Sequence, residues 1–322
     1  MRLRLVPEHT EWDFFKYRTV TFGISVTAMI ASIILWLTVG LNFGIDFQGG
    51  TTIRTQSTQP VVVGEYRDAI SPLGLGDVSI SEVYDPSFAA DHHVAMIRVQ
   101  SQDGQESASA ETIGKIETAL QTVDPSIKFT SVESVGPKVS GELIQTAILA
   151  VAASLAAILF YIWLRFEWQF SVGAVAALFH DVLVTIGIFA ALQIRFDLAT
   201  IAALLTIIGY SINDTVVIFD RLRENLRKYK TMPLRDVMNL SVNETLSRTL
   251  MTSGTTLIAL IALLVLGGDV IRGFVFAITW GIVVGTYSSV YVAKNIVLWL
   301  GVKRDWSKPT DTTGNQFANI DA

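Results

Sequence analysis

Two ionisable side chains, one within a long apolar stretch of this sequence and one directly beside the next, could carry out acid–base chemistry together. Asp214 lies six residues before Asp220, where a charged segment begins, so on a helix it is about 9 Å inside the apolar stretch. Arg248 directly precedes the next apolar stretch, a few residues into the next helix, and Thr252 follows it at i+4 on the same helical face. We therefore predict that Asp214 and Arg248 lie at similar depth on consecutive helices.

The predicted pair suggests a proton relay. Burial disfavours a charged carboxylate, whereas a nearby guanidinium favours it, so one proton on Asp214 changes the charge balance and frees Arg248 to reorient. A charge that crosses 100 mV releases about 2.3 kcal/mol, which is enough to bias a two-state membrane element. The alternative is a static salt bridge that joins two helices. Ionisable groups within membrane spans are functional candidates by default, which favours the relay.

Three further polar residues are candidates for a secondary relay or for structural hydrogen bonding. Asp181 lies near the middle of another apolar stretch, with His180 beside it, and Asn213 directly precedes Asp214. The sequence leaves both roles open for Asp181 and Asn213. For His180, packing is the simpler interpretation.

No motif predicts a catalytic residue, a metal site or a cofactor. The sequence has no cysteine, which excludes disulfides and thiolate ligands, and it lacks the GxxxxGK[ST], HExxH and GxSxG patterns. Its net charge of −5 gives no basic excess for nucleic acid. We expect a non-enzymatic protein that does not use ATP directly.

The elements that position these residues are membrane helices. The chain of 322 residues is 51% hydrophobic and 16% charged, with a mean hydropathy of +0.47, whereas soluble domains carry about 25% charged residues. About 20 apolar residues span a membrane as a helix. Six stretches qualify, and the third and fourth carry the polar groups above: residues 19–45, 143–164, 169–192, 198–219, 249–268 and 273–293. On the sixth stretch, Gly281 and Gly285 form a GxxxG pattern that predicts close helix contact.

Basic residues in the short connections predict the orientation. They concentrate before the first span, in the segment after the fourth span and in the tail, so we expect both termini to be cytoplasmic. The predicted organisation is a cytoplasmic segment (1–19), a retained first helix (20–43), a periplasmic domain (44–142), helices 2–6 (143–302) with a cytoplasmic loop (220–247), and a cytoplasmic tail (303–322).

The predicted periplasmic domain has an α+β pattern. Alternating apolar residues indicate strands, and apolar residues at helical spacing indicate helices. The order is β-α-β-β-α-β over 51–55, 62–70, 78–84, 93–99, 110–123 and 127–135. This order predicts a split-βαβ, ferredoxin-like domain between the first two helices.

Four motifs resemble the SecD/SecF family of the resistance-nodulation-division (RND) superfamily. GIDFQGGT at 44–51 follows the first span, VGPKV at 135–139 precedes the second, and FHDV at 179–182 lies in the third. The most specific is SINDTVV at 211–217, with Asp220-Arg221 and Arg223-Glu224-Asn225 after it, which resembles the fourth span of SecF rather than SecD. The resemblance extends over about Phe14 to Val302.

The resemblance implies half of a twelve-helix assembly whose other half is SecD. It implies a location in the bacterial inner membrane and a role in preprotein export through the SecYEG channel, driven by the proton gradient. SecA acts in the same export pathway, and YajC and YidC are further candidate partners beside membrane lipids. Among site residues it implies Asp214 and Arg248, with Thr252 as their neighbour.

The glycine motif at 44–51 has a physical interpretation of its own. Gly44, Gly49 and Gly50 allow the chain to turn sharply from helix to strand. Asp46 is expected to cap or hydrogen-bond this turn, so its predicted role is structural.

Two other functions stay open on the sequence. One is an RND-type half-transporter for a lipid or small molecule, and the other is a membrane scaffold without proton coupling. The choice between H⁺ and Na⁺ as the coupling ion also stays open.

Overall fold

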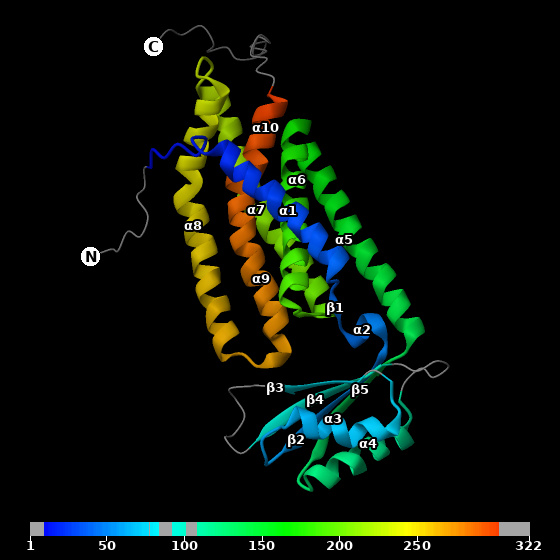
Figure 1. Cartoon of the computed structure of the whole chain (residues 1–322). Helices are drawn as coiled ribbons and strands as arrows, with labels where there is room; N and C mark the ends of the chain where they lie inside the picture. Colours follow the sequence, from blue (N-terminus) through cyan, green and yellow to red (C-terminus); the bar gives the residue numbers. More distant parts are fainter. Residues whose placement is uncertain (1–9, 77, 84–91, 101–107, 303–322) are drawn as a thin grey trace, which may run out of the picture.

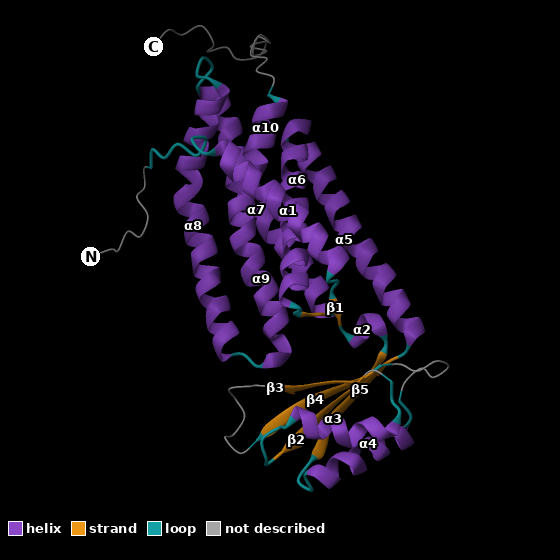
Figure 2. Ribbon diagram, viewed as in Figure 1, coloured by secondary structure: helices purple, strands orange, loops and turns teal. Residues whose placement is uncertain are grey.

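The fold is a bundle of membrane helices with a small α+β domain at one end (Figures 1 and 2). The structure is a computed structural model that describes residues 10–76, 78–83, 92–100 and 108–302, with the backbone alone for residues 137, 138, 269 and 270. The predicted cytoplasmic tail and the start of the predicted N-terminal segment lie outside the described residues. Within the described chain, both ends lie at the end of the bundle opposite the α+β domain.

Six helical segments are long and apolar enough to cross a membrane, which confirms the predicted number. They are α1 (Arg18–Thr38), α5 (Pro137–Arg165), α6 (Trp168–Leu192), α7 (Leu198–Lys228), α8 (Leu234–Leu266) and a last segment that combines α9 (Asp269–Ser288), the π-helical turn η2 (Ser289–Ala293) and α10 (Lys294–Leu300). A π-turn adds a residue to one helical turn and is often found at functional sites.

The charged segment 220–247 is largely helical rather than a loop. Helix α7 continues to Lys228, and α8 begins at Leu234. Arg221 of α7 joins the two helices, because its guanidinium donates to Glu244 of α8 at 2.7 Å. It also donates to Glu224 of its own helix at 2.6 Å. Hydrophilic residues are thus compatible with helix here, since the helical hairpin extends past the apolar stretches and its charges pair with one another.

The α+β domain has the predicted β-α-β-β-α-β order. Its elements are β2 (Gly50–Ser57), α3 (Val63–Ile70), β3 (Val78–Val83), β4 (His93–Val99), α4 (Ala110–Val123) and β5 (Lys128–Val135), with the short 3-10 helix η1 (Ser71–Leu73) after α3. The antiparallel sheet has the strand order β3-β4-β2-β5, which is the ferredoxin-like arrangement. Helices α3 and α4 cover one face of the sheet, and the other face is turned toward the bundle (Figure 2).

Two apolar clusters fill the bundle, one toward each end. The cluster nearer the α+β domain includes Phe189, Ile207 and Ile282, and the other includes Phe219 and Val297. Along α6, α7 and α9, many of the buried residues between these two clusters are polar, and apolar residues such as Leu183 and Ile208 lie among them. Uncharged apolar packing therefore encloses a polar layer in the middle of the membrane region.

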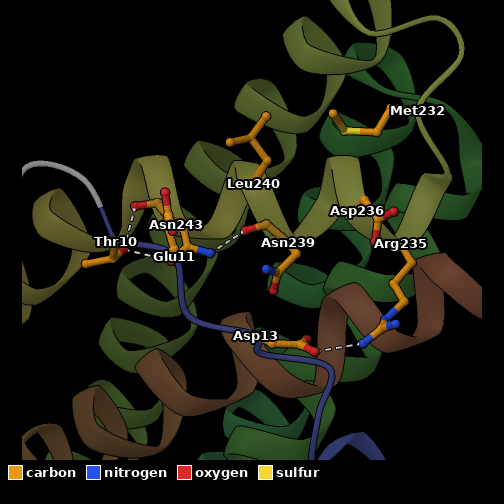
Figure 3. A pocket seen from close by; sticks show the side chains of 9 residues that line it. All are labelled: Thr10, Glu11, Asp13, Met232, Arg235, Asp236, Asn239, Leu240 and Asn243. Carbon is orange, nitrogen blue, oxygen red and sulfur yellow. Dashed lines mark hydrogen bonds and ion pairs between the residues drawn. The ribbon is translucent and has the colours of Figure 1, made fainter.

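The N-terminal segment before α1 is bound to α8 by side-chain amides (Figure 3). Asn239 and Asn243 donate to the carbonyl of Trp12 at 2.9 and 2.8 Å, and they accept from the backbone N–H groups of Phe14 and Trp12. The buried Lys294 donates to the carbonyl of Phe14 at 3.0 Å. Its ammonium also lies among aromatic rings, which favours a cation in a site with little water.

Candidate functional site: two carboxylates in a polar layer

Asp214 lies where three helices meet. It projects from α7 and is 5% exposed. Ser253 of α8 donates to its carboxylate over 3.4 Å, which is near the upper limit for a hydrogen bond. The same Ser253 hydroxyl shares a 2.8 Å hydrogen bond with Thr286 of α9. Asp214 therefore contacts α8 directly and α9 through one hydroxyl, and its own hydrogen bonding is weak.

Arg248 lies near Asp214 without pairing with it. Its charge acts on Asp214, but among the described residues no ion pair within 4.0 Å joins the two side chains. Arg248 and Thr252 are both exposed on the outward face of α8. The Thr252 hydroxyl donates to the backbone carbonyls of Arg248 and Thr249 instead of reaching the carboxylate. The static salt bridge considered from the sequence is thus absent from the described contacts.

Asp181 is the better satisfied of the two carboxylates. It projects from α6, is 1% exposed and lies 3.0 Å from the Nδ1 atom of His180. Its other carboxylate oxygen accepts from Ser211 of α7 at 2.6 Å and from Ser288 of α9 at 2.8 Å. Buried carboxylates are tolerated when donors surround them in this way. Asp181 therefore holds α6, α7 and α9 together.

Hydroxyl groups connect the surroundings of the two carboxylates. Ser289 shares a 2.8 Å hydrogen bond with Thr215, the residue after Asp214, and donates to the backbone carbonyl of Ser211 at 3.4 Å. We call this set the polar layer, and its members are Asp181, Ser211, Asp214, Thr215, Ser253, Thr286, Ser288 and Ser289. The sequence analysis did not connect these hydroxyls to the two carboxylates, because serine and threonine in membrane helices commonly bond to their own backbone and give no distinct pattern.

Close packing of α9 on α7 brings Ser288 to Asp181. A Cβ atom on Gly281 would lie 2.3 Å from Ile207, and one on Gly285 would lie 3.0 Å from Ser211. This confirms the close contact that the GxxxG pattern predicted. Only glycine permits such an approach, so the two glycines fix the distance across which the hydroxyls bond.

Asn213 takes no part in the polar layer. It is exposed and lines a groove between α5 and α7 with Tyr210. A helix turns by about 100° per residue, so the neighbours Asn213 and Asp214 point in different directions. The structure therefore separates Asn213 from both carboxylates.

The glycine motif connects α1 to the α+β domain and contains a short helix. After β1 (Asn42–Phe43), the helix α2 (Ile45–Gln48) precedes Gly49 and Gly50, whose φ angles are +72° and +120°. These angles favour glycine. Gly44 has an ordinary φ, but a Cβ atom there would lie 3.2 Å from Arg195 and Asp197.

Asp46 stabilises the start of α7 rather than its own turn. Its carboxylate accepts from the backbone N–H of Leu198, the first residue of α7, at 3.0 Å. Asp197 accepts from the N–H of Thr200 in the same helical turn. Carboxylates at a helix N-terminus satisfy free N–H groups. Asp46 is therefore a structural link from the glycine motif to the helix that carries Asp214.

The comparisons with known proteins agree with this architecture. Residues 115–303 match the family model "Protein export membrane protein SecD/SecF, C-terminal", and residues 34–61 match "SecD/SecF GG Motif". The chain is 71% identical to the protein translocase subunit SecF of Cereibacter sphaeroides over 321 residues, covering 100% of this chain and 99% of the relative. It is 42% identical to SecF of Vibrio alginolyticus, covering 92% of each.

Solved structures show the same fold in a longer chain. The crystal structure of SecDF from Thermus thermophilus superposes with a TM-score of 0.82 at 34% identity, over 93% of this chain. A SecDF structure in a super-membrane-facing form gives a TM-score of 0.67 at 36% identity. This chain spans 40% of the length of each. The chain thus belongs to the SecD/SecF family of protein-export membrane proteins, in its SecF branch.

Proposed function

We propose that this chain is an accessory subunit of the Sec protein-export machinery, which works with SecD and uses the proton gradient to promote preprotein translocation. The SecF branch supports the export role, and the likeness to SecDF supports SecD as the partner. The SecYEG channel and the translocating preprotein are the further proposed partners. SecA, YajC and YidC are proposed as less direct partners.

The weak hydrogen bonding of Asp214 carries the proposed coupling. Within the described part of the chain its carboxylate accepts one hydrogen bond, at 3.4 Å, while the charge of Arg248 acts on it from nearby. A proton can therefore bind without breaking a short bond, and its arrival removes the negative charge that attracts Arg248. The proton changes the electrostatic balance between α7 and α8.

The polar layer offers a way to transmit this change. The Ser253–Thr286 hydrogen bond connects the surroundings of Asp214 to α9, and Ser288 connects α9 to Asp181 on α6. A hydroxyl can both donate and accept, so these bonds can exchange partners when the proton binds. We propose that Asp181 and His180 hold the layer in place while Asp214 titrates.

The orientation is part of the proposal. Positively charged residues gather at the end of the bundle that carries the α7–α8 hairpin, which favours a cytoplasmic location for that end. The two termini are then cytoplasmic, and residues 44–142 form a periplasmic domain. The bacterial inner membrane is the proposed location, with the chain crossing it six times.

The test compares export into inverted membrane vesicles that contain SecD and an Asp214→Asn variant of this chain. Asparagine keeps the size and polarity of the side chain but does not titrate. We expect the variant to lose the stimulation of preprotein export by a proton gradient while ATP-driven export without a gradient continues. Replacing H⁺ by Na⁺ gradients in the same vesicles identifies the coupling ion.

Asp220→Asn is the matched control, because Asp220 lies on the same helix but is exposed and pairs with Arg165 at 3.0 Å. We expect this control to keep the full response to the gradient. A full response with Asp214→Asn would overturn the proposed coupling and leave the scaffold function. Transport of a lipid or small molecule by the chain with SecD, without an effect on export, would favour the half-transporter.

A further inference from the structure

A cavity of about 610 Å³ lies between the α+β domain and the helix bundle. The uncovered face of the sheet forms one wall. The segment after α6, the end of α8 and the start of α9 form the other. The side chains used below are Thr52, Arg54, Arg98 and Glu133 from the sheet, with Arg195 and Arg272 from the bundle.

Strand register places the polar groups in rows on this face. Thr52 of β2 pairs with Arg98 of β4 on one side and with Glu133 of β5 on the other. Side chains alternate along a strand, so the neighbours of Thr52 and Arg98 point to the apolar core under α3 and α4. The polar row is thus a regular feature of the sheet that faces the membrane region.

Several donors in the cavity make no hydrogen bond among the residues that the structure describes. The Thr52 hydroxyl is buried without a hydrogen bond, and the residue is 3% exposed. The Nε atoms of Arg98 and Arg195 are also buried without hydrogen bonds. Arg98 donates to the carbonyl of Phe43 at 2.9 Å through its Nη1 atom, and the Nε atom of Arg195 lies 3.8 Å from Asp197. Buried unpaired donors are costly, so their concentration in one cavity indicates an acceptor that belongs there.

The charge of the cavity favours an anion. Four arginines line it with two carboxylates, Glu133 and Asp197, and the negative charge of Asp46 also acts on Arg98. Burial and the neighbouring Arg195 guanidinium lower the pKa of Arg98. Like charges therefore lie close together in a partly enclosed space. Guanidinium groups bind phosphate oxygens with paired N–H donors, whereas ammonium groups act as point charges.

One side of the cavity opens onto apolar surface. Leu264 and Phe276 line it, and Val265 and Leu266 beside it at the end of α8 are 65% and 72% exposed. These residues lie at the ends of membrane spans, where lipid headgroups meet acyl chains. A ligand that fits has an anionic head for the arginines and an apolar tail for the end of α8.

We propose that this cavity binds the phosphate of an anionic phospholipid, which joins the α+β domain to the bundle. The phosphate oxygens accept from Arg98, Arg195 and Thr52, and the acyl chains lie against the exposed leucine and valine of α8. The lipid thereby holds the uncovered sheet face against the membrane region. This inference does not depend on proton coupling at Asp214.

The test uses the full chain purified with SecD in mild detergent and native mass spectrometry. The complex is incubated with phosphatidylglycerol, or with phosphatidylcholine of the same acyl chains. We expect selective retention of phosphatidylglycerol, reduced about tenfold or more in an Arg98→Gln/Arg195→Gln variant. Thr52→Val, nearly identical in shape, should reduce retention by a smaller factor without affecting folding. An Arg165→Gln/Arg223→Gln variant removes the same charge at the other end of the bundle and should retain lipid fully.

Added inorganic phosphate distinguishes the two sources of the anion. Retention of phosphatidylglycerol in excess phosphate supports the lipid, because the tail contributes to binding. Complete displacement by phosphate would overturn the lipid and leave a site for the free anion. Equal retention in the wild type and the double arginine variant would overturn the site, as would binding of an acidic peptide in its place.

Discussion

Asp181 and Asp214 are buried at neighbouring positions of the same bundle, but their surroundings differ. Asp181 has two short hydroxyl donors and a histidine nitrogen at 3.0 Å, whereas Asp214 has one donor at 3.4 Å. A satisfied carboxylate fixes the helices around it. One with a single weak bond can gain a proton at low cost. In the function proposed above, Asp181 therefore has the structural role and Asp214 the titrating one.

The largest expected effect tests the structural role of Asp181. Asp181→Leu removes the bonds that Asp181 makes with Ser211, Ser288 and His180, and each buried hydrogen bond lost costs about 1–3 kcal/mol. Ser288 keeps only its 3.1 Å bond to the carbonyl of Gly285. We expect a loss of at least about 3 kcal/mol in the free energy of unfolding, measured by denaturation of the complex with SecD in detergent. Asp214→Leu is the matched variant and should cost less than half as much. Equal losses would remove the distinction between the two sites.

A somewhat smaller effect should follow from moving α9 away from α7. In Gly281→Ala the new Cβ atom would lie 2.3 Å from Ile207, so the helices must separate. Overpacking of this kind costs about 1–3 kcal/mol. We expect lower thermal stability and weaker protection of α9 from hydrogen exchange. Gly209→Ala on α7 is the control, since nothing lies within 4 Å of its added Cβ atom, and a similar loss there would contradict the packing explanation.

The serine donors allow a direct comparison of the two carboxylates. Ser288→Ala removes a 2.8 Å bond to Asp181. Ser253→Ala, made in a Thr286→Val background in which the 2.8 Å Ser253–Thr286 bond is already absent, removes the 3.4 Å bond to Asp214. We expect losses of about 1–2 kcal/mol and less than about 0.5 kcal/mol in the free energy of unfolding. If Ser253→Ala costs as much as Ser288→Ala, Asp214 is as firmly held as Asp181.

Asp124, a buried carboxylate outside the membrane helices, provides a further comparison with Asp181, because hydroxyl groups also bond to it. Its substitution gives the smallest expected effect. Burial acts to raise the pKa of Asp124 in the α+β domain, but hydrogen bonds from Ser57 and Ser126 outweigh it and leave the pKa below its usual value. A lowered pKa contributes stability above the unfolded value of about 3.9, and this contribution is lost as the pH falls through the folded value.

Asp124→Asn should therefore cost about 1 kcal/mol at neutral pH, as its hydrogen bonds weaken. The difference from the wild type should be constant between pH 5 and 7 and shrink below about pH 4, as the pH falls through the lowered folded pKa. Denaturation curves over this pH range measure it. Asp68→Asn, on the helix α3 of the same domain, is an exposed control expected to show no such change. If the stability difference between wild type and Asp124→Asn grew as the pH fell, the pKa of Asp124 would not be lowered in the folded protein.

The sequence alone determined the six membrane helices and the order of elements in the α+β domain. An apolar stretch long enough to cross the bilayer forms a helix there, because its backbone N–H and C=O groups have no water to bond with and must bond to one another. Alternation along 93–99 and helical spacing along 110–123 are equally local signals, because each depends only on neighbours within the element. The glycine spacing at 281 and 285 predicted close packing for the same reason.

Only the tertiary structure decided which polar groups meet. The sequence placed Asp214 and Arg248 at similar depth, but their separation depends on how α7 and α8 rotate about their axes, which local patterns do not specify. The partners of Asp181 come from positions 211 and 288, and Asp46 caps a helix that begins at residue 198. Contacts between residues so distant in the chain depend on packing. A local sequence pattern shows which face of a helix or strand is buried, but it does not show which other element packs against that face.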